Sequence, residues 1–136
     1  GNSFAIVHVA DTEILKNLKP DFDAIRDISE TFGLIGYYIF ATPEDYGDYD
    51  ATARMFAPAY GINEEAATGM AAGPLACYLH DITGLRKSTY IIQQGVFMDT
   101  PSPSRIEVKL TVENGSITGL LAGGKGKVME MRTVEI

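Results

Sequence analysis

Residues 70–82 read Met-Ala-Ala-Gly-Pro-Leu-Ala-Cys-Tyr-Leu-His-Asp-Ile, and this stretch decides the fold. Its residues are apolar or small almost all the way round, so the pattern predicts a helix over 70–82 without a polar face. Pro74 is tolerated only in the first turn of a helix, which places the beginning of the helix near Met70. A helix of this kind is buried on every side, and we therefore expect a sheet or barrel wrapped around one central helix.

Apolar and alternating runs on both sides of this helix predict the strands of that sheet. The predicted strands are 4–9, 37–41, 51–58, 90–94 and 106–112, the last with the period of a half-buried strand. Asn114-Gly115 predicts a two-residue hairpin turn, after which the chain returns through Ile117 and Leu120. The glycine-rich stretch 123–126 predicts a bend, and residues 128–136 are expected to add a last strand.

A second helix is predicted to open at Pro20, because proline suits the first helical turn. Asp21 and Asp23 favour the positive end of that helix, and Gly33 is typical of a C-terminal cap. One apolar stripe runs along it, formed by Phe22, Ile25, Ile28 and Phe32. Asp11 is expected to cap a shorter helical turn that carries Ile14, Leu15 and Leu18. The sequence therefore predicts an amphipathic helix that lies on a sheet.

These elements predict an α+β fold, with a mostly antiparallel, curled sheet or barrel around a buried central helix. The 136 residues are expected to form a single domain, 1–136. The chain begins with Gly1 rather than Met, which fits a piece of a longer gene. Eleven Lys and Arg against eighteen Asp and Glu give a net charge of −7, which disfavours nucleic acid as a partner. One Cys and no apolar stretch of about 20 residues predict a cytoplasmic protein with no membrane partner.

The segment between the strand 51–58 and the central helix is the candidate site. The backbone amides of Gly69, Met70 and Ala71 are expected to lack partners at the beginning of the helix, which favours a carboxylate or another anion. Gly69 lets a ligand approach the backbone closely. Glu65 lies near this terminus and could transfer or orient a proton. The alternative interpretation is a glycine selected for close packing, with no ligand.

Residues 56–73 read Phe-Ala-Pro-Ala-Tyr-Gly-Ile-Asn-Glu-Glu-Ala-Ala-Thr-Gly-Met-Ala-Ala-Gly. This stretch resembles a signature of the PhzF-like family of phenazine-biosynthesis proteins, usually written FAP…GI-EDPATGSAAG. The resemblance continues through Gln94-Gly95, the Pro-Ser loop at 101–104 and Gly123-Gly124, and it reaches back to Gly1-Asn2. It covers the whole chain but only the C-terminal half of the family's two-domain protein. It implies the fold of diaminopimelate epimerase, with a central helix in each half.

The resemblance also implies an active site in the cleft between two such halves. Isomerase members move a proton with a carboxylate from the N-terminal half, which this chain lacks, and the signature loop assists. Glu65 stands where the family has Asp, and Thr68 and Gly69 match outright. Met70 replaces a Ser and has no hydroxyl, although its backbone amide is retained. Two further departures are Ala66 in place of Pro, and Asp99-Thr100 where the family often has an Arg.

Two functions remain open at this point. The first is a cofactor-independent isomerase or epimerase on a small carboxylate, completed by an N-terminal half or by a second copy in a homodimer. Its predicted catalytic residue is Glu65, and its predicted substrate-binding residues are Thr68, Gly69, Met70 and Ala71. The second is a non-catalytic module that binds small anions. Neither includes a cofactor or a metal.

Other candidate residues have plainer interpretations. Cys77 lies in the middle of the central helix and is expected to be a buried, inert thiol. His8 and His80 have no spacing typical of a metal site, and His80 is interpreted as a cation near a helix C-terminus. The acidic loop 42–50 could meet a cationic partner but is expected to be a solvated connection.

Overall fold

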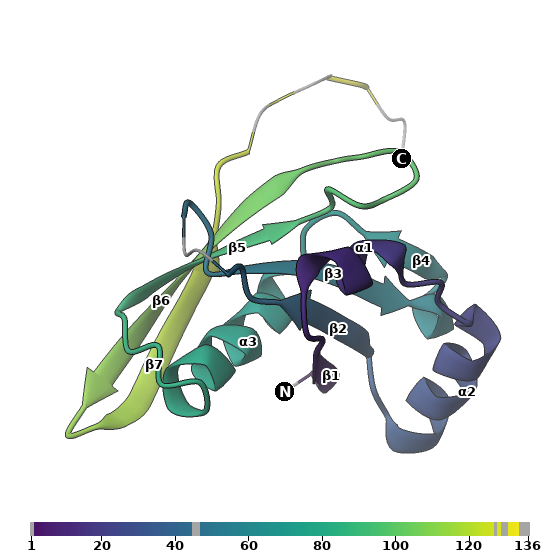
Figure 1. The fold of residues 1–136 in the computed structure, drawn as a ribbon. Helices are drawn as coiled ribbons and strands as arrows, with labels where there is room; N and C mark the ends of the chain where they lie inside the picture. The colour runs from purple at the N-terminus through teal and green to yellow at the C-terminus, as the bar shows by residue number, and fades with distance from the viewer. Residues whose placement is uncertain (1, 45–46, 127, 129–130, 134–136) are drawn as a thin grey trace.

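The computed structural model describes residues 2–44, 47–126, 128 and 131–133. In this part of the chain, seven strands form one sheet with the path β1-β2-β3-β5-β6-β7, and β4 pairs with β3 (Figure 1). The strands are β1 (Phe4–His8), β2 (Gly36–Ala41), β3 (Ala51–Ala57), β4 (Ile62–Glu65), β5 (Thr89–Gln94), β6 (Ser104–Glu113) and β7 (Ser116–Gly123). The helices are α1 (Thr12–Asn17), α2 (Phe22–Phe32) and α3 (Gly69–Asp81), with a 3₁₀ turn η1 (Pro58–Tyr60).

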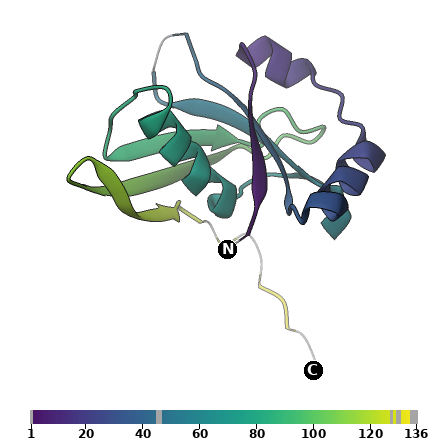
Figure 2. The same ribbon diagram turned by 90° about the horizontal axis from the view of Figure 1, so that it is seen from below.

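The sheet curls around α3, which lies between β1 and the β6–β7 hairpin (Figure 2). The buried core is formed by one face of this helix and the strand residues that point toward it. Its largest fully buried members are Tyr38, Phe40, Leu75, Leu79, Tyr90 and Ile92. Small residues such as Ala71, Ala72 and Gly73 bring the helix close to the sheet. The predicted α+β fold with a curled sheet around a central helix is therefore confirmed.

Strand β3 lies in the middle of the molecule, and all seven of its residues are buried. Met55 and its alternate neighbours face α3 and join the core. Arg54 and Phe56 point to the opposite face, where α1 and α2 pack: the Phe56 ring meets Phe22 of α2 at 6.2 Å between centroids. The sheet is thus covered on both faces at β3, which explains why its sequence does not alternate between apolar and polar residues.

The sheet is mixed but mostly antiparallel, as predicted. Only β1 with β2 and β3 with β5 are parallel pairs, and the other four pairs are antiparallel. The predicted Asn114-Gly115 turn joins β6 to β7, and both residues have positive φ, 51° and 80°. Such a turn matches the right-handed twist of the two strands, so the hairpin prediction is confirmed.

The prediction that the central helix is buried on every side is wrong. Met70 is 60% exposed, Pro74 is exposed, and Cys77 and Tyr78 are only half-buried. These positions share one side of α3, because they are separated by steps of three and four residues. The sheet does not close over this side, since β1 and β7 are its two ends and are not paired with each other. The protein is a half-barrel with an apolar line of helix exposed between two strand edges.

Helix α2 differs from its prediction in smaller ways. Asp21, not Pro20, caps α2, and its side chain accepts from the amide of Ala24 at 3.0 Å, so Pro20 precedes the helix. Gly33 ends the helix with φ 63°, as expected. The predicted apolar stripe of α2 is only partly covered, since Ile28 is 42% and Phe32 71% exposed.

Two segments differ from the sequence prediction near the site and near the C-terminus. Strand β4 lies where the sequence predicts no strand, because its sequence Ile-Asn-Glu-Glu is short and polar. In the predicted last strand, Val128 and residues 131–133 lie in neither helix nor strand, and the rest lies outside the described residues. No helix in the described ranges has the length and apolarity needed to cross a membrane.

Candidate functional site

The loop that leads into α3 is fixed by Gln94, a fully buried side chain at the end of β5. Its Nε2 donates to the Glu65 carbonyl at 2.7 Å and to Thr68 Oγ1 at 3.0 Å. Its Oε1 accepts from the Thr68 amide at 3.1 Å and from the Tyr38 hydroxyl at 2.9 Å. All four hydrogen-bonding positions of the amide are therefore used, and only one orientation of the amide group satisfies them.

The segment around residues 101–104 holds the same loop from its other side. Ser104 Oγ donates to the Ala66 carbonyl at 2.7 Å. Gly95 follows Gln94 with φ 78°, and a Cβ there would overlap the carbonyl oxygen of Ser102. Only glycine combines that backbone conformation with so close an approach. The Gln-Gly pair and the Pro-Ser loop thus share one structural task, which is to fix residues 65–68.

Glu65 lies at the end of β4, half-buried, and is bound by the residue that caps α3. Thr68 Oγ1 donates to Glu65 Oε2 at 2.8 Å and accepts from Gln94. Thr68 itself is only 3% exposed. Its hydroxyl therefore positions the Glu65 carboxylate, and its side chain is already occupied within the protein. A direct contact of Thr68 with a substrate stays a prediction.

The beginning of α3 offers fewer amides than the sequence suggested. The amides of Ala71 and Ala72 donate to the Thr68 carbonyl, at 3.2 and 3.0 Å. Among the residues that the structure describes, the amides of Gly69 and Met70 have no backbone acceptor. The predicted anion site therefore depends on Gly69 and Met70, and the occupied amide of Ala71 argues against a binding role for that residue. The Met70 side chain is exposed, and its sulfur accepts from Asn2 Nδ2 at 3.1 Å.

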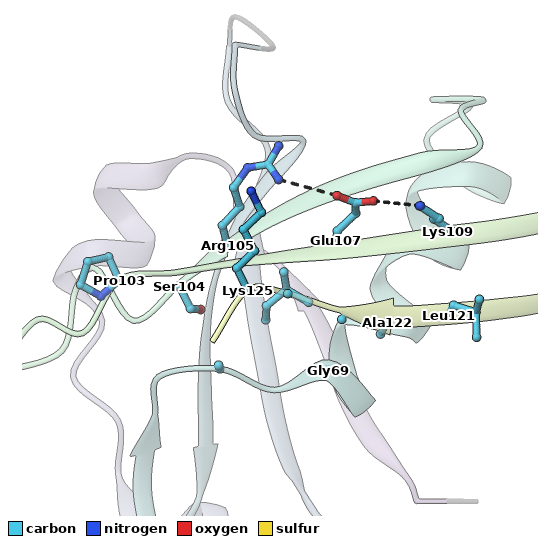
Figure 3. Close-up of a pocket in the computed structure, with 13 residues that line it drawn as sticks. Gly69, Pro103, Ser104, Arg105, Glu107, Lys109, Leu121, Ala122 and Lys125 are labelled. Carbon is cyan, nitrogen blue, oxygen red and sulfur yellow. Dashed lines mark ion pairs between the residues drawn. The ribbon is translucent and has the colours of Figure 1, made fainter. Parts of the chain in front are cut away.

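A groove of about 880 Å³ lies along the beginning of β6 and the end of β7, away from the turn that joins them, and reaches Gly69. Figure 3 shows Arg105, Glu107, Lys109 and Lys125 along one side of this hairpin and Gly69 on the other side of it. Glu107 forms ion pairs with Lys109 Nζ at 3.4 Å and with Arg105 Nη1 at 3.8 Å. Three cations and one carboxylate make this groove positive in a chain whose net charge is −7. Glu65, Thr68 and Met70 do not line it.

Cys77, His8 and His80 pack against other residues of the protein. Burial raises the pKa of the Cys77 thiol, and the nearby Asp81 carboxylate raises it further, so less thiolate forms at a given pH than in a free cysteine. His8 stacks on Phe40 with 4.7 Å between ring centroids. His80 is buried and hydrogen-bonds through Nδ1 to the Tyr90 hydroxyl. Across the described ranges, no three His, Cys, Asp or Glu side chains are grouped as metal ligands.

Sequence reasoning missed the role of Gln94 and Ser104. Both lie in segments that were used as marks of the family resemblance, but neither was assigned a contact. The signal in the sequence was the polar Gln94 at the end of an apolar strand, directly before a glycine. Such a side chain needs a partner, and the loop before α3 supplies it.

Comparison with known proteins places this geometry in a family. The sequence matches the family described as phenazine biosynthesis-like protein over residues 1–131. An uncharacterized isomerase of Clostridium acetobutylicum is 39% identical over 79 residues, which are 58% of this chain and 26% of the relative. A trans-2,3-dihydro-3-hydroxyanthranilate isomerase of Pseudomonas aeruginosa is 51% identical over 51 residues, 37% of this chain and 18% of the relative. An uncharacterized isomerase of Schizosaccharomyces pombe is 29% identical over 97% of this chain and 71% of the relative.

Solved structures share the fold. A PhzF-family phenazine biosynthesis protein of Bacillus anthracis superposes with a TM-score of 0.69 at 20% identity, covering 91% of this chain and 43% of that one. A predicted epimerase of Pseudomonas aeruginosa superposes with a TM-score of 0.56 at 21% identity, covering 96% and 44%. The chain thus spans less than half the length of these structures and of the Clostridium relative.

Proposed function

Because this chain belongs to the phenazine biosynthesis-like protein family, we propose that it is one half of a cofactor-independent isomerase or epimerase acting on a small carboxylate. The relatives named as isomerases support this reaction class. One observation carries the proposal: Thr68, which directly precedes Gly69 and Met70, binds the Glu65 carboxylate, and Gln94 holds both Glu65 and Thr68.

In the proposed reaction, Glu65 accepts or returns a proton at a carbon next to the substrate carboxylate. Breaking a C–H bond this way requires a positioned base and a favourable environment for the negative charge that develops. Thr68 holds one oxygen of the Glu65 carboxylate at 2.8 Å, which leaves the other oxygen for the proton. The amides of Gly69 and Met70, with the positive end of the α3 dipole, bind the substrate carboxylate.

A second half completes the site in this proposal. An isomerase that moves a proton from one position to another needs a second acid or base on the opposite side of the substrate. The chain covers 43% of the Bacillus anthracis structure, which leaves room in that protein for another unit of similar size. The second half is an N-terminal half of the same kind or a second copy of this chain, since a two-fold axis reproduces the symmetry of two related halves.

A non-catalytic anion-binding module is the alternative. Met70 favours it, because the family's Ser at this position supplies a hydroxyl that a thioether does not. The two functions share the helix-end amides and differ at Glu65. Binding of a small carboxylate without any exchange of its carbon-bound protons identifies the module.

The first experiment is the mass of the protein in solution, by size exclusion with light scattering. A mass of twice the chain supports a site shared between copies, and a monomer directs the search to a separate N-terminal half. In the assembly so identified, deuterium exchange from solvent into small carboxylic acids measures the chemistry.

We expect the exchange rate to fall at least about tenfold in Glu65→Gln, because the amide cannot accept the proton. The control is Glu30→Gln, an exposed carboxylate on α2, which should leave the rate unchanged. An unchanged rate in Glu65→Gln would assign the base to another residue.

A further inference from the structure

A second hollow lies at the other end of α3. Its volume is about 480 Å³, and its polar lining is formed by His80, Arg86, Lys87, Ser88 and Thr111. His80 is eleven residues from Gly69 on the same helix, so the two ends are roughly 16 Å apart at 1.5 Å per residue. The hollow is therefore separate from the candidate site at Gly69, and the proposed isomerase reaction does not use it.

The neighbours of His80 determine which of its ring nitrogens donates a hydrogen bond. Tyr90 has one hydroxyl proton, and it donates that proton to the Leu85 carbonyl. The Tyr90 oxygen accepts from the Lys87 amide at 3.0 Å, and His80 Nδ1 lies 2.9 Å from it. Because the tyrosine proton is already used, the remaining contact requires His80 Nδ1 to be the donor. In the neutral imidazole, Nε2 then carries the lone pair and acts only as an acceptor.

This acceptor is the unusual feature of the hollow. His80 is 5% exposed, and within the described residues its Nε2 has no hydrogen-bond partner. A buried polar atom without a partner is destabilising, so most such atoms are satisfied by protein, water or a ligand. The polar residues that share the hollow are mainly donors, but none of them reaches Nε2. A ligand that donates one hydrogen bond to Nε2 fits this arrangement.

The other polar residues of the hollow favour negative charge. Arg86 is exposed, and no ion pair is seen for it in the part of the chain that the structure describes. Lys87 Nζ is held at 2.6 Å from Asp50, which positions its charge and partly neutralises it. Ser88 and Thr111 add hydroxyl groups. The hollow thus combines one acceptor that needs a donor with a cation that is free to bind an anion.

We propose that this hollow binds a phosphate group that still carries a proton, as inorganic phosphate does at neutral pH. Hydrogen phosphate has both required features: its P–OH donates to His80 Nε2, and its charged oxygens accept from Arg86 and the hydroxyl groups. Sulfate has the same shape but no proton at neutral pH. Nε2 has no exposed surface in this structure, so contact with it requires residues 86–88 to move; these residues are exposed and lie in neither helix nor strand.

The expected affinity is modest. Asp81 next to His80 and the carbonyl end of α3 oppose an anion, and Arg86 has to outweigh them. We therefore expect a dissociation constant of about 1 mM, which corresponds to roughly −4 kcal/mol.

Side-chain NMR of the two histidines tests the proposal directly. The sequence has two His, so His8 on β1 is an internal control. Titration with inorganic phosphate at neutral pH and constant ionic strength should shift the His80 Nε2 resonance saturably, with a midpoint of about 1 mM, and leave His8 unchanged. Sulfate should bind at least about fivefold more weakly. Phosphate bound at Gly69 would not move the His80 resonance, so this result is independent of the proposed function.

Two variants complete the test. Arg86→Gln should weaken phosphate at least about threefold, whereas Arg26→Gln, which removes a cation from α2, should not change it. The proposal is overturned if phosphate up to about 50 mM leaves the His80 resonance unshifted. It is equally overturned if sulfate and phosphate bind alike, or if the two arginine variants behave the same.

Discussion

Replacing Gln94 with Leu tests whether one side chain fixes the candidate site. Leucine has a similar size but cannot hydrogen-bond, so the change removes all four hydrogen bonds of the buried amide. Thr68 Oγ1 keeps its bond to Glu65, whereas the Tyr38 hydroxyl, the Thr68 amide and the Glu65 carbonyl lose their partner. Tyr38 and Thr68 are 0% and 3% exposed, so water does not replace the missing amide.

The magnitude follows from these three groups. Each buried polar group without a partner costs about 1–3 kcal/mol, and the extra apolar contact of leucine returns part of this. We expect Gln94→Leu to lower the free energy of unfolding by about 3–6 kcal/mol, a large part of the ~5–15 kcal/mol typical of a domain. The neighbouring Gln93→Leu is the matched control, since its half-buried side chain accepts one bond, from Thr52 at 3.1 Å. That change should cost about 1 kcal/mol.

Urea unfolding followed by circular dichroism measures both variants. In the double variant Tyr38→Phe and Gln94→Leu, the hydroxyl that lost its acceptor is gone. The two changes should therefore cost less together than their sum, by about 1 kcal/mol or more. If Gln94→Leu costs no more than Gln93→Leu, Gln94 does not hold the loop and the reasoning about the site is refuted.

Two further predictions concern an ion pair and the cysteine. Arg54 and Glu64 form an ion pair at 2.8 Å with side chains only 8% and 13% exposed, so Glu64→Gln should cost about 3–5 kcal/mol in urea unfolding. Asp23→Asn, which breaks an exposed pair with Arg26, should cost less than about 1 kcal/mol, and equal costs would contradict the assignment. Since burial and Asp81 raise the pKa of Cys77, less thiolate is present at a given pH, and iodoacetamide should modify the folded protein more slowly than the urea-unfolded chain. Equal rates would show a reactive thiol.

Sequence patterns predicted the elements of the fold well, because local rules control them. The Asn114-Gly115 hairpin, the Gly33 cap and the apolar helix each depend on residues within a few positions. Strand β4 was missed for the opposite reason. Its polar sequence has no β pattern of its own, and it is a strand because Met55 and Ala57 of β3 pair with it.

The exposed side of α3 shows a different limit of sequence reasoning. The composition of the helix fixes how apolar it is, but not whether a neighbouring strand covers it. Met70 and Pro74 are as apolar as Ala72, yet they lie between the two ends of an open sheet. Whether the exposed side of α3 is covered depends on how many strands the sheet has and on which other parts of the protein pack there. The sequence of the helix alone does not contain this information.

The candidate site was predicted in position but not in detail. The glycine and the preceding carboxylate located the helix end, as the anion-site argument required. The occupied amide of Ala71 and the role of Thr68 in holding Glu65 depend on where the first turn closes and on Gln94, which is 26 residues from Thr68. Contacts over such separations leave no local pattern in a single sequence.

The hydrogen bonds of Gln94 also determine when the site forms as the chain folds. Tyr38 is 56 residues and Glu65 is 29 residues from Gln94 along the sequence. Loop-closure entropy over such distances must be overcome before these contacts stabilise anything, which makes them late events in folding. A chain that has emerged from the ribosome only as far as α3 carries Glu65 and Gly69 but not the side chain that fixes them. The ordered site thus requires the sheet to be complete at least through β5.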